Sequence, residues 1–336
     1  NTCTAGTIKM VISTNYITIF IYGVISYSTA ASSTANVQIR ILKNWGTLYF
    51  DDFSINCLDC LSPSFSSYFI SQSGDDNNLG TITDPWKTLE KVSRQTLSPG
   101  DSVLFNRGDR FDGHLSINGS GTETLPIVIG SYGTGNKPII SAEVGFAGIR
   151  FFSERNTIIG QEKNFNNITI ENCYFNNLQR LGVHIKHGGS SSGVGNDSIN
   201  KNSNIVCRNN HFYRTGGTCI LPIRTYNCLI EDNLFDRPGD NSDTRMPNRG
   251  SAVWTWNCKY TIIQRNECLH IRGYLDSHGI HIDHHNDHTY VQYNYMEDCE
   301  GGFVEILGGN TNAVYRFNIS VNDGWRDNPN WINSNH

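Results

Sequence analysis

Apolar and polar residues alternate along short stretches of this chain, and one nine-residue stretch recurs six times. Strict alternation is typical of a β-strand, whose successive side chains point to opposite faces. No copy has the i, i+3, i+4 apolar spacing of an amphipathic helix. We therefore predict a strand in each copy. The copies are NITIENCYF from Asn167, NIVCRNNHF from Asn204, NCLIEDNLF from Asn227, YTIIQRNEC from Tyr260, HTYVQYNYM from His288 and NAVYRFNIS from Asn312.

The copies follow one another at intervals of 23 to 37 residues. Self-similarity at such intervals indicates a solenoid, in which each repeat buries its apolar face against its neighbours. We expect the fourth position to point inward and the asparagines of the seventh to stack and bond one another, a structural role. The fourth position holds Ile170, Cys207, Ile230, Ile263, Val291 and Tyr315, and the seventh holds Cys173, Asn210, Asn233, Asn266, Asn294 and Asn318.

A second strand pattern, usually led by glycine, follows each stretch: LGVHIKH, GGTCILPIR, GSAVWTW, HGIHIDHH and GGFVEILGG. Two recurring strands per turn give at least two parallel sheets, so we predict a parallel β-helix. Neighbouring turns of such a coil lie about 4.8 Å apart, which would join distant residues into one groove. The predicted outer face presents His184, Lys186, Arg224, Trp254, Trp256, His281, Asp283 and Glu305.

The segment before the solenoid differs in pattern. Residues 8–27 are rich in β-branched and aromatic types with strand-like alternation, which favours strands over a signal peptide or a membrane span. The later GTLYFDDFSI resembles the closing strand of jelly-roll carbohydrate-binding modules. We predict an incomplete β-sandwich over 1–61, a linker over 62–67 and the β-helix over 68–336. An incomplete sandwich favours a larger parent chain or a sheet completed by a partner. The stretch DPWKTLEKV predicts a short helix that caps the solenoid.

Composition narrows the function classes. The net charge is −5 and no Lys/Arg cluster occurs, which argues against nucleic acid as a partner. The chain has ten cysteines. Cys173 and Cys207 occupy inward positions, where cysteine acts as a small hydrophobe. Cys268 and Cys299 lie one turn apart and could form a disulfide bridge. Sequons are compatible with a secreted, glycosylated protein. They lie at Asn118, Asn167, Asn196 and Asn318.

A family resemblance rests on several of these phrases. Residues Tyr68 to Ser141, with PGDSVLFNRGD and IGSYGTGNKPII, closely resemble the first segment of right-handed parallel β-helix proteins of the pectin-lyase-like superfamily. GSAVWTW, DSHGIHID, YNYMEDCEGGFVEIL and RFNISVNDG are similar in order to extracellular members. The resemblance covers about four-fifths of the chain and implies the fold. It does not select an activity, because the superfamily includes lyases, glycosidases, epimerases, adhesins and structural spikes.

The densest group of reactive side chains runs from Asp276 to His288 and holds five of the eleven histidines. Its His/Asp set could bind a divalent metal, although no established ligand spacing is present, so we predict no metal site there. A histidine such as His278 or His281, or a lysine, could remove the proton α to a uronate carboxylate, the lyase reaction, with Ca²⁺ or arginine neutralising that carboxylate. Two carboxylates could instead hydrolyse a glycosidic bond. The remaining alternative is a solvated turn left from an ancestral site.

For hydrolysis the expected pair is Asp283 and Glu305. The two stack on adjacent turns if Gly302 lies opposite Ile280, whereas Glu305 points inward if Gly302 lies opposite Gly279. The sequence does not choose the register. The lyase alternative needs a cation near its base, and the candidates are Lys186 and Arg224, two or more turns away.

Two further groups could contact ligands. Trp254 and Trp256 are two residues apart on one strand, so an exposed pair would stack on sugar rings and a buried pair would belong to the core. The oxygen-rich run Asp75 to Asn78 could hold Ca²⁺, the one candidate cofactor, or form an ordinary polar turn.

The sequence thus supports two functions. The first is a secreted carbohydrate-active protein that binds or cleaves a polysaccharide along the solenoid. The second is a non-catalytic subunit of an extracellular filament or surface assembly, because an uncapped solenoid end favours self-assembly.

Overall fold

The computed structural model describes residues 8–12, 17–21, 65–142, 147–152, 164–186, 202–239, 250–273 and 277–325. The chain divides into two compact units, Asn1–Ser64 and Phe65–His336. In the first unit β1 (Ile8–Ile12) and β2 (Ile17–Ile21) pair as an antiparallel hairpin. The rest of the sandwich predicted for residues 1–61 lies outside the described residues. Within the described part, no helix is long and apolar enough to cross a membrane.

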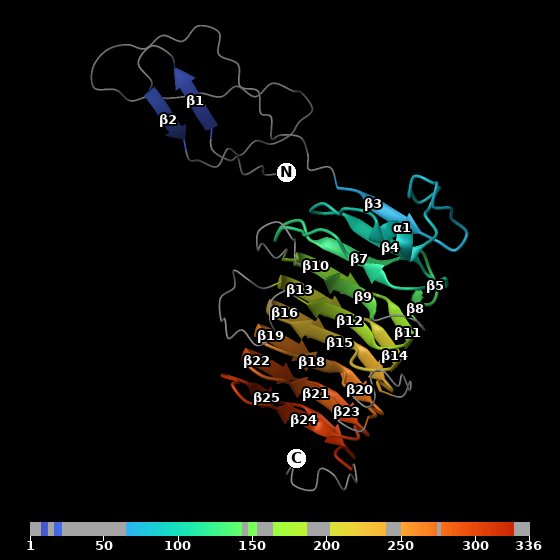
Figure 1. Ribbon diagram of the computed structural model, residues 1–336, viewed down its shortest axis with the longest axis vertical. Helices are drawn as coiled ribbons and strands as arrows, with labels where there is room; N and C mark the ends of the chain where they lie inside the picture. The colour runs from blue at the N-terminus through green and yellow to red at the C-terminus, as the bar shows by residue number, and fades with distance from the viewer. Residues whose placement is uncertain are drawn as a thin grey trace. The chain divides into compact units, whose positions relative to one another are not determined.

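The second unit is a right-handed parallel β-helix (Figure 1). Its described strands form three parallel sheets, one more than the minimum that the repeats require. The nine-stranded sheet contains β3 (Ser67–Ile70), β4 (Ser102–Asn106), β7 (Ile127–Tyr132), β10 (Asn166–Glu171), β13 (Asn202–Arg208), β16 (Thr225–Glu231), β19 (Lys259–Gln264), β22 (Asp287–Gln292) and β25 (Val314–Arg316). 

The other two sheets complete each turn of the coil. The eight-stranded sheet contains β5 (Arg110–Asp112), β8 (Ile139–Ser141), β11 (Tyr174–Leu178), β14 (His211–Thr215), β17 (Leu234–Asp236), β20 (Glu267–Leu269), β23 (Tyr295–Glu297) and β26 (Ile319–Val321). The seven-stranded sheet contains β6 (Leu115–Ser116), β9 (Ala147–Phe152), β12 (Leu181–Lys186), β15 (Ile220–Ile223), β18 (Val253–Thr255), β21 (His278–Ile282) and β24 (Gly302–Ile306).

The core lies between the three sheets, where inward side chains stack from turn to turn. The fourth positions of the repeat pair in register, for example Ile170 with Cys207 and Cys207 with Ile230, which confirms the predicted inward column. Cys173 and Cys207 are both fully buried, as predicted. Burial raises the pKa of each of these two thiols to about 12, so they remain protonated and act as small apolar side chains.

The corners of the coil require left-handed backbone. The first position of the repeat has φ between 54° and 55° in all six copies, and the sixth has φ between 51° and 60°. Early copies place asparagine or aspartate at these corners, the non-glycine residues that tolerate this conformation best. Later copies place larger side chains there, including Tyr260, Arg265 and Phe317. Repetition of the backbone is therefore stricter than repetition of the sequence.

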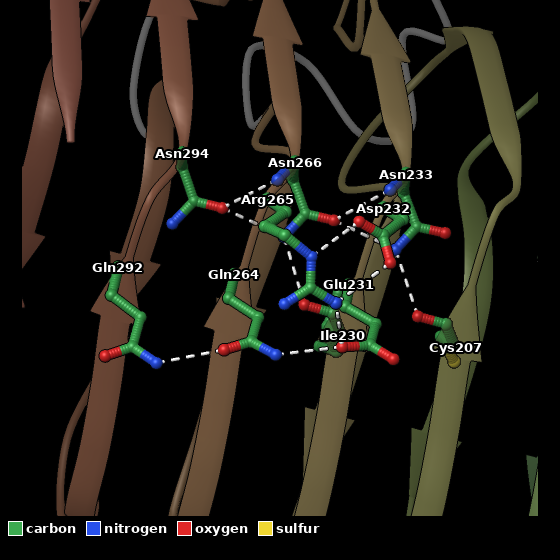
Figure 2. Close-up of polar contacts among 10 residues, drawn as sticks. All are labelled: Cys207, Ile230, Glu231, Asp232, Asn233, Gln264, Arg265, Asn266, Gln292 and Asn294. Atoms are coloured by element: carbon green, nitrogen blue, oxygen red, sulfur yellow. Dashed lines mark hydrogen bonds and ion pairs between the residues drawn. The ribbon is translucent and has the colours of Figure 1, made fainter. Parts of the chain in front are cut away.

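The asparagines of the seventh position form the predicted ladder, part of which is drawn in Figure 2. The side-chain amide of Asn233 donates to Asn266 Oδ1 at 3.0 Å, and that of Asn266 donates to Asn294 Oδ1 at 3.0 Å. Each amide also donates to a carbonyl, as Asn266 does to Ile230 O at 3.0 Å. Each Oδ1 also accepts a backbone N–H from the previous turn, for example that of Asn233. The ladder thus satisfies buried polar groups at this corner.

A second polar ladder follows the outer face of the nine-stranded sheet (Figure 2). Gln292 donates to Gln264 Oε1 at 2.9 Å, and Gln264 donates to Glu231 Oε2 at 2.9 Å. Arg265 bridges Glu231 and Asp232 at 2.5 and 2.8 Å. These groups are partly solvated, so each contact contributes little to stability.

The predicted helix is present but shorter and later than DPWKTLEKV implies. Helix α1 (Leu89–Ser93) begins after Thr88, whose hydroxyl accepts the backbone N–H of Lys91 at 3.1 Å. Asp76 accepts the backbone N–H groups of Lys87 and Thr88 and the Thr88 hydroxyl. This N-terminal cap explains why the helix starts at Leu89 and not at Pro85.

Two predictions concern covalent modification of side chains, namely a disulfide bridge and N-glycosylation. Cys268 and Cys299 are both buried free thiols, so the suggested bridge between them is wrong. Of the sequons, Asn196 lies outside the described residues. The amide of Asn318 donates to Val291 O at 3.0 Å and belongs to the buried ladder, and that of Asn167 donates to Gly121 O at 3.1 Å. A glycan on either would compete with those bonds.

Candidate functional site

The outer face of the seven-stranded sheet gathers most of the predicted site residues. His184 pairs with Leu221 on the next turn, Trp254 pairs with His281, and His281 pairs with Glu305. Pairing of Ile220 with Val253 brings Leu221 beside Trp254 and completes one column. In a second column Lys186 pairs with Ile223, and Ile223 bridges to Trp256. The sheet therefore aligns side chains that are far apart in sequence.

The register of β24 on β21 differs from both alternatives considered above. Gly302 lies opposite His278, and Glu305 lies opposite His281. Glu305 consequently shares the side of His281 and does not point inward, but it does not stack directly on Asp283. The expected pairing of the two carboxylates on adjacent turns is therefore wrong by two residues.

Both His278 and His281 contact the Glu305 carboxylate. His278 Nδ1 lies 2.9 Å from Glu305 Oε2, and His281 Nε2 lies 3.4 Å from the same oxygen. Residues three apart on a regular strand face opposite ways. Here, however, Gly279 packs toward Met296 in the core and Ile280 is fully buried, so two successive residues turn inward between the histidines. His278 is the first residue of β21.

The neighbouring residues Trp254, Asp283 and His284 form a second polar group. Trp254 donates its indole N–H to Asp283 Oδ2 at 2.6 Å. Asp283 Oδ1 accepts the backbone N–H of His284 at 2.6 Å and is also bonded to His284 Nδ1. Because an ionised carboxylate only accepts, this bond places a proton on Nδ1, and in the neutral form of the ring Nε2 carries the lone pair. Within the described residues, Nε2 of His284 has no hydrogen-bond partner.

Exposure separates the members of this region. His278, His281 and Asp283 are 2%, 1% and 4% exposed, whereas the side chain of His284 is 48% exposed. The indole of Trp254 lies parallel to the imidazole of His281, with ring centroids 4.9 Å apart. Packing therefore holds the buried side chains in place. Among the members of this region, His284 is the imidazole that solvent and ligands can reach.

The other predicted residues are placed less centrally. Trp254 is 8% exposed and packs with Leu181, Leu221 and Ile223, while Trp256 is partly buried at the edge of this cluster. Lys186 ends β12, three strands from β21, and Arg224 follows β15 at a left-handed corner. Asp276 lies outside the described residues. The described structure therefore brings together Trp254, His278, His281, Asp283 and Glu305, but not the two cations.

The turn after β21 ends at a strongly bonded carboxylate. Asp287 accepts the Thr311 hydroxyl at 2.8 Å and the Asn312 amide at 2.9 Å, and it lies 3.3 Å from Lys259 Nζ and 2.7 Å from His288 Nδ1. Burial opposes its ionisation, but these hydrogen bonds outweigh burial and hold the pKa of Asp287 well below its usual range. The Asp287 carboxylate therefore holds the turn in place. None of its described contacts directs an oxygen towards the candidate site.

The oxygen-rich run Asp75 to Asn78 forms the alternative polar turn. Asp75 Oδ1 accepts the backbone N–H and the side-chain amide of Asn77 at 2.8 and 2.9 Å. Asp76 caps the start of helix α1. Both carboxylates are thus engaged by protein donors, and nothing in this arrangement gathers oxygens toward a common point.

His284 is the residue that the sequence analysis missed. It lay in the histidine-rich stretch, but its position after the strand made it one of several similar turn residues. The signal that could have found it is the adjacent pair Asp283 and His284. Asp283 ends the outward alternation of β21, so an imidazole directly after it can turn back onto the carboxylate.

No family model and no curated protein sequence matches this chain. The fold resembles that of alginate lyase from Paenibacillus sp. strain FPU-7, at 14% identity over 77% of this chain and 77% of that chain, with a TM-score of 0.54. Two further structures are GH136 lacto-N-biosidase from Eubacterium ramulus (21% identity, 78% of this chain, 66% of that chain, TM-score 0.43) and a rhamnogalacturonan lyase (13%, 77%, 74%, 0.39).

At 14% identity the likeness to the alginate lyase shows the fold alone. The present chain spans 66% of the length of the lacto-N-biosidase, just under two thirds. The parallel β-helix predicted from the repeats is confirmed, as is the right hand that the family resemblance implied.

Proposed function

We propose that this chain is a secreted carbohydrate-active protein that cleaves an acidic polysaccharide by β-elimination on the outer face of the seven-stranded sheet. One observation supports the reaction: the Asp283 and His284 pair, in which a buried carboxylate holds the Nδ1 side of a half-exposed imidazole. A base held by a carboxylate in one tautomer is the usual arrangement for proton abstraction near neutral pH.

In the proposed step His284 is the base and water supplies the proton for the leaving group. His284 Nε2 takes the proton on the sugar carbon next to the uronate carboxyl group. The electrons of that C–H bond form a C=C double bond, and the glycosidic C–O bond on the following carbon breaks. The leaving oxygen takes a proton from water and becomes a new hydroxyl, and the His284 imidazolium afterwards returns its proton to the solvent. The indole N–H of Trp254 keeps Asp283 in place throughout, so Trp254 acts as a positioning residue.

Hydrolysis by two carboxylates fits the contacts less well. Glycoside hydrolysis needs one carboxyl group on each side of the scissile bond, available as acid and as base or nucleophile. Both oxygens of Asp283 accept hydrogen bonds from Trp254 and His284. Glu305 Oε2 lies between the imidazoles of His278 and His281. Neither carboxylate is placed as an independent acid facing a substrate.

Partly buried Trp256, directly after the strand that holds Trp254, supplies a sugar-contacting surface at the edge of the apolar cluster. A uronate polymer would also bring its own negative charge to a chain of net charge −5. Local positive charge must therefore hold its carboxylate. Lys186 in the adjoining column is the described cation that could hold a neighbouring sugar unit.

The test is a depolymerisation assay of the whole protein against alginate, pectate, fucoidan and a neutral glycan. Absorbance near 235 nm reports the unsaturated product of elimination, and a reducing-end assay reports every cleavage. We expect both signals together on a uronate polymer and neither on the neutral glycan. Reducing ends without unsaturated product would replace elimination by hydrolysis. Silence on all substrates would overturn cleavage and favour the binding or filament function.

A further inference from the structure

We propose that His278, His281 and Glu305 form a binding site for a transition-metal ion such as Zn²⁺ or Co²⁺. One ligand atom from each residue lies within 4.8 Å of the other two. Ligands about 2.0–2.2 Å from a shared ion lie roughly 3.0–3.5 Å from one another. The distance of 3.4 Å from His281 Nε2 to Glu305 Oε2 falls within that range, and the 2.9 Å from His278 Nδ1 to the same oxygen lies just below it.

The donor set selects the class of metal. Two imidazole nitrogens and one carboxylate oxygen suit zinc, iron, cobalt, nickel or copper, and three protein ligands leave positions open for water or substrate. Calcium and magnesium take oxygen ligands. The Ca²⁺ suggested by the sequence therefore does not fit this group of residues.

The surroundings hold the three ligands in place. The His278 and His281 side chains are 2% and 1% exposed, and the Glu305 side chain is 13% exposed. Trp254 stacks on the His281 ring and fixes its plane. Opposite His278, Gly302 has φ of 116°, which only glycine adopts readily, and a Cβ there would lie 3.6 Å from His278 Cδ2. Ligands that are packed before the ion arrives lose little freedom on binding.

The site is separate from the Asp283 and His284 pair, and its metal affinity does not depend on the proposed reaction. If the proposed function holds, the ion has an evident role that rests on it. β-Elimination needs a positive charge to neutralise the uronate carboxylate as the adjacent proton leaves. An ion bound by His281, two residues before Asp283, would supply that charge, which Lys186 is too distant to supply.

The experiment uses the full chain, freed of metal with a chelator. Co²⁺ is titrated in and followed by its visible d–d absorption, and Zn²⁺ binding is measured by calorimetry. The test variant is Glu305→Gln, which keeps the size of the side chain but removes its charge, and His281→Ala provides a second. The control is His288→Asn, which removes another imidazole–carboxylate contact on the next strand.

We expect the wild type and His288→Asn to bind one more ion than the test variants, or to bind it at least about 100-fold more tightly. We also expect the ion to raise the midpoint of thermal unfolding of the wild type by several degrees and not that of Glu305→Gln. Equal Co²⁺ binding by the wild type and Glu305→Gln would overturn the site, as would no binding at all. Because neither readout is enzymatic, metal binding without polysaccharide cleavage would reject the proposed function and keep the site.

Discussion

Two polar surfaces run along this solenoid, and they differ in how they repeat. At the corner that ends the nine-stranded sheet, successive turns stack the same residue, asparagine, from Asn210 to Asn318. On the outer face of the seven-stranded sheet, successive turns stack Leu221, Trp254, His281 and Glu305. The first column bonds like to like, whereas every member of the second differs from its neighbours.

The difference separates structure from chemistry. An amide stacked on an identical amide has both a donor and an acceptor satisfied on every turn, so repetition solves the problem of burying polar groups. Titratable and aromatic side chains in the second column form specific unlike pairs, such as indole with carboxylate and imidazole with carboxylate. When equivalent positions on successive turns of a solenoid hold unlike residues, those positions therefore indicate a candidate site.

The largest expected effect is on the free energy of unfolding, and it comes from a substitution in the asparagine ladder. Asn266→Ala removes a buried side chain that bonds Ile230, Asn233 and Asn294. Because several buried partners lose their bonds together, the free energy of unfolding should fall by about 3–5 kcal/mol. The matched change Gln264→Ala, in the same copy but on the outer ladder of Figure 2, should cost under about 1 kcal/mol. Urea unfolding of both variants measures the difference, and equal losses would contradict a structural asparagine ladder.

A smaller effect is expected from Trp254→Phe, which keeps an aromatic ring beside His281 but removes the hydrogen bond to Asp283. We expect cleavage to slow about tenfold and the free energy of unfolding to fall by about 1–2 kcal/mol. The pH dependence of the rate should also shift, because Asp283 holds His284. Trp256 Nε1 has no hydrogen-bond partner within the described residues, so Trp256→Phe is the control and should leave the pH profile unchanged. Identical profiles for both variants would remove Trp254 from its positioning role.

The smallest effect concerns the turn between the two surfaces. Hydrogen bonds depress the folded-state pKa of Asp287, so its contribution to stability is present above its unfolded pKa of about 3.9 and is lost as the pH falls through the lower folded value. Asp287→Asn should therefore cost about 1 kcal/mol at pH 7 and progressively less below pH of about 4. Thermal unfolding of both proteins across this range tests the sign. A gap that widens in acid would contradict it.

The repeats predicted the fold because their geometry is local. The alternation of apolar and polar residues identifies each strand, and the recurring glycines and asparagines mark the corners. The asparagine column follows from one alignment of the six copies. The prediction of at least two sheets is satisfied by the three observed, and the third has no clear pattern of its own because strands such as β17 and β20 span only three residues.

The site was only partly predictable, because it depends on register and on one irregular strand. Glu305 reaches His278 and His281 through the pairing of Gly302 with His278, which no local pattern encodes. His278 and His281 meet because Gly279 and Ile280 both turn inward, against the rule used to place side chains. Asp283 was identified correctly as part of the region, but its bond to His284 needed three-dimensional placement of the turn.

The most direct test of the functional face is the initial rate of unsaturated product formation by His284→Ala on the polymer that the wild type cleaves. His285→Asn is the matched control, since it replaces the adjacent histidine and tolerates the left-handed backbone at φ of 61°. We predict that His284→Ala loses at least about 100-fold in rate, with little change in unfolding temperature because this side chain is half exposed. We predict that His285→Asn stays near the wild-type rate. A fully active His284→Ala would contradict the proposed base.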